Sequence, residues 1–110
     1  MSERKYIAVG SGKDEKSLWV GHFGISPFYF VYDDEGNLIE KRVNPYSKGQ
    51  HHDDPRLIIK FLDDCKVFIA KRMGEESRKK LVTELNIETF LTKAKTVQEA
   101  IEEWKNRKLN

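Results

Sequence analysis

All three histidines of this 110-residue chain fall in two loops, and they are the residues best suited to metal chemistry. His22 lies between Gly21 and Phe23 in the stretch VGHFG, whereas His51 and His52 form an adjacent pair followed by two aspartates. Imidazole is a common ligand for borderline and transition metals, and carboxylates add hard oxygen donors. These residue types predict a metal or cluster site, provided that the fold brings the two loops together.

A plainer interpretation of both loops stays open. Asp54 can cap a helix that begins at Pro55, which would leave His51 and His52 as incidental residues of a polar surface loop. His22 can equally be a loop histidine hydrogen-bonded to backbone, with its flanking glycines serving only the bend. The chain contains no compact zinc-ligand spacing, so spacing alone does not decide between a metal site and a solvated loop.

Other chemistry is restricted by what the chain lacks. Cys65 is the only cysteine, which excludes an internal disulfide and a four-cysteine zinc or iron–sulfur site in a monomer. No G-x-S-x-G, Cys–His or paired-carboxylate pattern indicates a hydrolase, and VGSGKDEKS lacks the spacing of a phosphate loop. Gly74 begins an expected helix just after Lys71 and Arg72, and this start offers backbone N–H groups to an anion.

The hydrophobic pattern predicts one domain over residues 1–110, in the element order β-β-β-α-β-α-β-α. An aromatic run, FYFVY, is followed by the turn DDEGN and a returning strand, which predicts a hairpin over residues 28–43. The expected strands cover residues 6–10, 28–32, 38–43, 67–70 and 87–92. The expected helices have these buried stripes: Ile58, Phe61, Leu62 and Cys65 after Pro55; Leu81, Val82 and Leu85 after Gly74; and Val97, Ala100, Ile101 and Trp104 after the capping box at Thr96.

Connection rules then predict a mixed five-stranded sheet with helices packed on it. The hairpin makes the second strand antiparallel to its neighbours, and right-handed helical crossovers make the last two strands parallel to each other. The carboxyl ends of four strands meet at one edge, where ligands of open α/β sheets bind. Both histidine loops and the segment from Lys71 to Gly74 are expected at this edge.

Composition narrows the class of protein. Twenty basic and eighteen acidic residues give a net charge of only +2, which predicts no nucleic-acid partner. No segment reads as a signal peptide or a membrane span, so we expect a cytoplasmic protein without a membrane partner. Many lysines and glutamates with few glutamines favour a thermophilic source.

The chain resembles a known family in five stretches that together run from Tyr6 to about Trp104. These are YIAVGS, VGHFGISPFYFVYDDEGN, RVNPYSKGQHH, VFIAKRMGEESRKKL and TVQEAIEEW. They are similar to the dinitrogenase iron–molybdenum cofactor biosynthesis family of prokaryotes, which includes NifX-like and NifB C-terminal-type domains. The resemblance implies a three-layer α/β/α, ribonuclease-H-like fold. It departs from the family pattern at Asp53 and Asp54, where glycines often follow the His-His pair, and at Ser11-Gly12-Lys13 after the first strand.

The resemblance also implies a function, namely a small non-enzymatic carrier or chaperone of iron–sulfur or molybdenum-containing clusters. It implies His22, His51 and His52 as metal ligands, and Phe23, Gly24 and Gly74 as further cluster-binding residues. Cluster-donor or acceptor proteins would be the partners. Two alternatives remain: an interaction or regulatory module that kept the fold without the ligand, and an enzyme that uses His22 as a general base.

Overall fold

A computed structural model describes residues 4–45 and 60–109 of the chain. The elements run in the order β1 (Tyr6–Ser11), η1 (Phe23–Ile25), β2 (Phe28–Tyr32), β3 (Leu38–Val43), β4 (Cys65–Ala70), α2 (Glu75–Leu85), β5 (Glu88–Leu91) and α3 (Val97–Leu109). Most of the helix expected after Pro55 lies outside the described residues. Neither α2 nor α3 is long and apolar enough to cross a membrane.

The five strands form one mixed sheet in the order β3-β2-β1-β4-β5. β2 runs antiparallel to both β1 and β3, whereas β4 lies parallel to β1 and β5 parallel to β4. The predicted topology is therefore confirmed, with the hairpin at one side of the sheet. The hairpin turn uses Gly36 at φ 86°, a backbone conformation that favours glycine.

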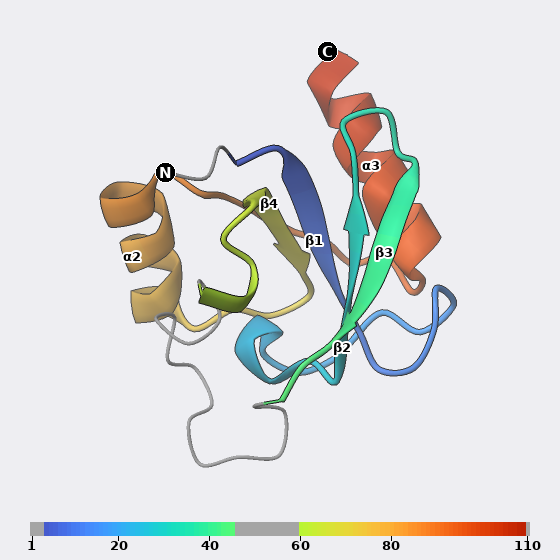
Figure 1. Ribbon diagram of the computed structural model, residues 1–110, viewed down its shortest axis with the longest axis horizontal. Coiled ribbons are helices and arrows are strands. Elements are labelled where there is room, and N and C mark those ends of the chain that lie inside the picture. Colours follow the sequence, from blue (N-terminus) through green and yellow to red (C-terminus); the bar gives the residue numbers. More distant parts are fainter. Residues whose placement is uncertain (1–3, 46–59, 110) are drawn as a thin grey trace.

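The two described helices cover opposite faces of the sheet (Figure 1). We call the two packed layers the α3-face core and the α2-face core. The α3-face core joins aliphatic side chains of β1 and β4 to the buried residues of α3. The α2-face core joins Leu81 of α2 to the opposite side chains of the same strands. Because β1 and β4 are covered on both faces, their sequences are almost continuously apolar.

Helix α3 begins as the sequence predicts. The Thr96 hydroxyl accepts the backbone N–H of Glu99 at 3.0 Å, which satisfies one of the unpaired donors of the first turn. Trp104 is 1% exposed and its indole N–H donates to the Glu88 carboxylate at 3.1 Å. The predicted burial of Trp104 is therefore confirmed.

Two details of the predicted core are wrong. Val82 was expected on the buried stripe of α2 but is 44% exposed, because the helix packs through Leu81, and Val82 lies about 100° further round. Cys65 was expected on a helix face but is the first residue of β4, after a turn at residues 62–64. Its predicted burial is nevertheless confirmed, at 0% exposed.

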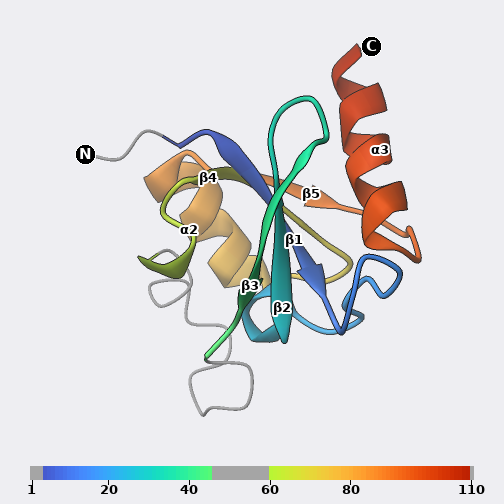
Figure 2. The same ribbon diagram turned by 45° about the vertical axis from the view of Figure 1, so that its right-hand side comes forward.

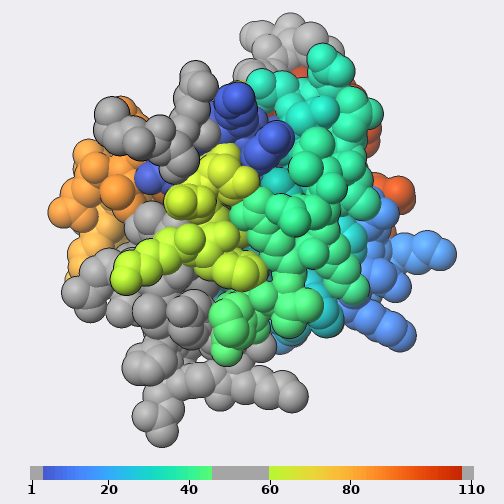
Figure 3. All heavy atoms as spheres, in the orientation of Figure 1, coloured from blue at the N-terminus to red at the C-terminus, as the bar shows by residue number. Residues whose placement is uncertain are grey.

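The edge strand β3 is irregular, and three of its six residues are charged. Its pairing with β2 shifts register between Val31 and Tyr32, which leaves Ile39 without a partner of its own. Figure 3 shows β3, in green, at the surface beside the segment that leads into β4. There Arg42 donates to both carboxylate oxygens of Asp64, at 2.9 and 2.7 Å, and so fastens this edge to the α2 side of the molecule.

Candidate functional site

The loop that carries His22 lies at the carboxyl edge of the sheet, as the topology predicts. His22 forms an isolated parallel bridge with Arg72, which follows the end of β4. The backbone N–H of Phe23 donates to the Arg72 carbonyl at 3.0 Å. Figure 2 shows this loop, in light blue, at the end of the sheet where the β1 arrow points. His22 is therefore held beside the segment that leads into α2.

Trp19 fixes the backbone of His22 from the other side. Its indole N–H donates to the His22 carbonyl at 3.0 Å, and its own backbone N–H donates to the Gly10 carbonyl at 3.1 Å. The indole lies so close to Gly21 that a Cβ there would meet the ring nitrogen at 2.9 Å. The loop therefore needs glycine at position 21, because a side chain there would clash with the Trp19 indole.

Phe23 anchors the loop through its ring and its carbonyl group. The ring is 2% exposed and stacks on Phe68 of β4, with the ring centroids 4.7 Å apart. Its carbonyl accepts the hydroxyl of Tyr29 at 2.6 Å and that of Ser26 at 2.8 Å. Burial raises the pKa of Tyr29 well above its usual value, so the phenol stays a donor. Phe23 is therefore a residue of the α2-face core.

Asn44, directly after β3, holds the backbone of the His22 loop by hydrogen bonds. Its side-chain amide donates to the carbonyl groups of Gly24 at 3.1 Å and Ser26 at 2.8 Å. Its backbone N–H donates to the carbonyl of Pro27 at 3.0 Å. Asn44 is 3% exposed, so these hydrogen bonds replace water around an otherwise buried backbone. Gly24, expected at the site, thus lies in a loop with a fixed backbone.

Gly10 makes the close packing of this edge possible. A Cβ at this position would lie 2.3 Å from the hydroxyl oxygen of Ser26, so no larger residue fits without movement. The glycine stands one residue before the end of β1, where the His22 loop crosses the strand. The loop is therefore packed directly on the sheet.

Gly74 is the N-cap residue of α2, two residues after the Arg72 that bridges to His22. The cap has no side-chain hydrogen bond, and its position agrees with the prediction. The first turn also carries Glu75 and Glu76, whose exposed carboxylates compete with any anion for the N-terminal N–H groups. Lys71 and Arg72 supply positive charge at the same edge.

The other expected ligands are not brought to His22 by the described structure. His51 and His52 lie outside the described residues. Within residues 4–45 and 60–109, no three His, Cys, Asp or Glu side chains are grouped closely enough to hold a metal ion. Cys65 begins β4 and so lies at the opposite end of that strand from Arg72. Burial raises the pKa of its thiol to about 12, with the Asp64 charge adding to the effect. Cys65 is therefore no ligand of this site.

Sequence reasoning missed Trp19 and the part that Asn44 plays. Trp19 stands three residues before His22 and two before Gly21, which is the spacing of a local side-chain-to-backbone contact. Asn44 precedes Pro45, but its partners lie eighteen and twenty residues earlier. A single sequence carries no signal for contacts at that separation.

Comparisons with known proteins agree with the fold of the chain. A family model described as dinitrogenase iron–molybdenum cofactor matches residues 3–107.

A Thermotoga protein with a provisional NifB assignment in the DUF35 family has a similar solved structure. It is 23% identical with a TM-score of 0.69, and the match covers 93% of this chain and 88% of that chain. The apo form of the orange protein from Desulfovibrio gigas is 18% identical with a TM-score of 0.69, over 97% and 92% of the two chains. At these identities the likeness concerns the fold. A search of curated proteins gives no significant match.

Proposed function

The chain belongs to the dinitrogenase iron–molybdenum cofactor family, and from this membership we propose that it is a small non-enzymatic carrier or chaperone of a metal cluster. The cargo would be an iron–sulfur or molybdenum-containing cluster, or a simpler metal ion. Such a cluster brings its own sulfides, so a protein with one buried cysteine can still hold it through histidine. Cluster-donor and acceptor proteins of the cytoplasm are the partners that this role implies.

One observation carries the proposal, namely the fixed placement of His22 at the carboxyl edge. The backbone on either side of this residue is held by Arg72 and Trp19. A ligand on a fixed backbone loses little conformational freedom when it binds metal. The strand order and the two covering helices also support the ribonuclease-H-like assignment, which forms part of the same proposal.

His51 and His52 enter the proposal from sequence alone, as further metal ligands. In that arrangement Phe23 and Gly24 shape the loop, and Gly74 offers backbone N–H groups to the cargo. Lys71 and Arg72 favour an anionic cluster over a bare cation. Asp53 and Asp54 favour a cation if they face the cargo, but not if they cap the helix that the sequence predicts after Pro55.

The test is anaerobic titration of the apoprotein with a preformed iron–sulfur cluster, with tetrathiomolybdate and with divalent iron, followed by absorption spectroscopy and metal analysis. We compare wild type with His22→Ala, His22→Cys and His51→Ala. Cysteine at position 22 restores a metal ligand. His22→Cys therefore separates the loss of a ligand from other effects of replacing this residue. Since imidazole binds metal in its neutral form, binding through histidine should also weaken on acidification.

Weaker binding by His22→Ala with recovery in His22→Cys would support the proposal. Equal binding by wild type and both alanine variants, or no binding by any protein, would remove the carrier function. An interaction or regulatory module with the same fold would then be the better account. Turnover of a substrate that depends on His22 would instead favour the enzyme alternative.

A further inference from the structure

The second edge of the sheet carries features that the cluster proposal does not use. β5 is the terminal strand in the sheet order and is only four residues long, Glu88–Leu91. Within the described part of the chain, no strand pairs with its outer side. A terminal strand offers unpaired N–H and C=O groups, which can accept a further strand.

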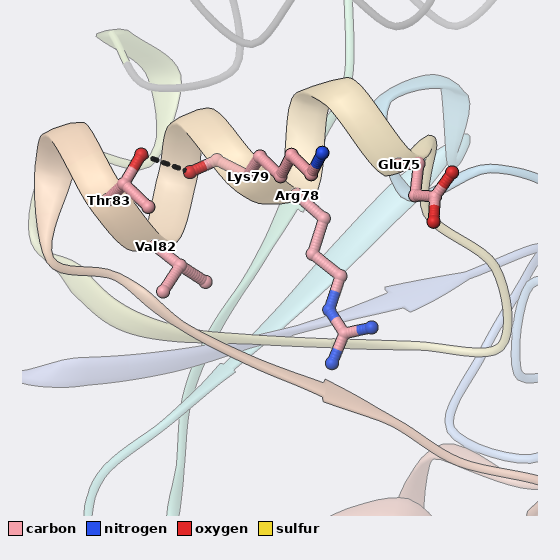
Figure 4. A pocket seen from close by; sticks show the side chains of 5 residues that line it. All are labelled: Glu75, Arg78, Lys79, Val82 and Thr83. Carbon is pink, nitrogen blue, oxygen red and sulfur yellow. Dashed lines mark hydrogen bonds between the residues drawn. The ribbon is translucent and has the colours of Figure 1, made fainter.

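Helix α2 lies beside β5 and bears a shallow hollow. Five side chains of one helical face line it: Glu75, Arg78, Lys79, Val82 and Thr83. Figure 4 shows Arg78 and Val82 extending from the helix toward the adjacent strand. Arg78 reaches that strand, since its Nε donates to the Thr89 hydroxyl at 2.9 Å. The hollow and the open strand edge are therefore parts of one surface, which we call the β5 groove.

The β5 groove combines apolar and positively charged side chains. Val82 is 44% exposed and Leu91 is 40% exposed, although both are large aliphatic residues of regular elements. Pairing with β4 places Leu91 opposite Ala70 of the α2-face core, and hence on the side of the sheet that α2 covers. Arg78 and Lys79 are exposed around the hollow, against one carboxylate from Glu75.

We propose that the β5 groove binds an extended, acidic peptide segment of a partner protein by strand addition. The backbone of the segment pairs with β5, one aliphatic side chain covers Val82 and a second covers Leu91, and a carboxylate between them meets Arg78 and Lys79. Strand addition of this kind takes affinity from main-chain hydrogen bonds and specificity from alternate side chains. The proposal is independent of the cluster site.

Other occupants fit the surface less well. A second copy of the chain paired through β5 would bring two α2 helices together, each with the same excess of positive charge from Arg78 and Lys79. The hollow is lined by one helix, so it does not enclose a small molecule. Nucleic acid could meet the cations but has no main chain to pair with β5.

The experiment uses a fluorescein-labelled peptide of the repeat Val-Ser-Glu-Ser, in which valine and glutamate alternate along one face of the extended chain, with fluorescence polarisation as the readout. A peptide of the repeat Val-Ser-Lys-Ser and a Val-Ser-Glu-Ser peptide with alternate N-methylated amides are the controls. We compare wild type with Arg78→Glu, Val82→Asp and Lys80→Glu. Lys80 is an exposed cation of α2 that does not line the hollow, so it is the matched control for Arg78.

We expect wild type and Lys80→Glu to bind the acidic peptide with similar affinity, and Arg78→Glu and Val82→Asp to bind about tenfold more weakly. The lysine peptide and the N-methylated peptide should not bind. Amide chemical-shift changes in wild type should concentrate at residues 75–91. No binding, equal binding by Arg78→Glu, shift changes elsewhere on the molecule, tighter binding to an RNA oligonucleotide, or self-association in place of peptide binding would each overturn the proposal.

Discussion

The two faces of the sheet differ in how they contact the loop that carries His22. The α3-face core contains Phe30, Tyr32 and Trp104 among aliphatic side chains, but no residue of the histidine segment Gly21 to Gly24. The α2-face core contains Phe23 of that segment, whose ring packs against Tyr29 and Phe68. A change in the α2-face core should therefore disturb the His22 loop more than a change of equal cost in the α3-face core. The predictions below test this separation.

The largest effect is expected at Trp104 in the α3-face core. Trp104→Ala removes a large side chain that is 1% exposed, so the free energy of unfolding should fall by about 3–5 kcal/mol. Urea unfolding measures the loss, and Glu102→Ala, an exposed change on the same helix, is the control. Below the midpoint the amide shift of His22 should stay near its wild-type position. An unchanged melting temperature would mean that α3 packs differently.

The next effect concerns Asn44, which supports the site from the other face. Asn44→Ala leaves the carbonyl groups of Gly24 and Ser26 without their side-chain donor, at a cost of about 1–3 kcal/mol. The amide resonances of His22 and Phe23 should shift, whereas that of Ala100 in α3 should not. Equal shifts on both faces would contradict the separation of the two cores.

A matched pair of tyrosines sharpens the comparison further. Tyr29→Phe removes the donor to the Phe23 carbonyl, and Tyr32→Phe removes the donor to the Glu15 carboxylate. Tyr29→Phe also removes an acceptor of the Asn44 amide, and the Tyr32 bond is made to a charged group, so each variant should cost about 1–2 kcal/mol. Only Tyr29→Phe should move the His22 resonances, and equal displacement by both variants would count against the separation.

The smallest effect is expected at the ion pair of Asp64 and Arg42. The Arg42 guanidinium lowers the pKa of the Asp64 carboxyl, so the folded state is stabilised above the unfolded pKa of about 3.9. That stabilisation is lost as the pH falls through the lower folded pKa. Asp64 is 29% exposed, so Asp64→Asn should cost less than about 1 kcal/mol near neutral pH. Urea unfolding near pH 2 should give a smaller difference, and an equal one would exclude the ion pair as its cause.

The sequence predicted most of the fold because its local patterns were strong and its connections few. The aromatic hairpin and the Thr96 capping box each have a short-range signal, and handedness rules set the strand directions. Val82 was placed wrongly because Leu81, Val82 and Leu85 fit two phases of one helix, and only tertiary packing selects between them. Cys65 was placed wrongly because it lies three residues after Leu62, which suits a helix, and two residues before Val67, which suits a strand.

The candidate site was predicted less completely. The position of His22 at the carboxyl edge followed from topology, and the structure confirms that position. Its attachment by Trp19, Arg72 and Asn44 depends on side chains from separate parts of the chain, which periodicity cannot reveal. The roles of His51 and His52 as ligands stay predictions.

The irregular β3 strand has a consequence for molecules that meet at high concentration in the cell. The register shift at Ile39 bends the edge away from a flat template. Leu38, Ile39 and Val43 are exposed there, at 45%, 45% and 66%, and would otherwise favour the addition of further strands. The shape of the edge therefore opposes fibril growth from β3.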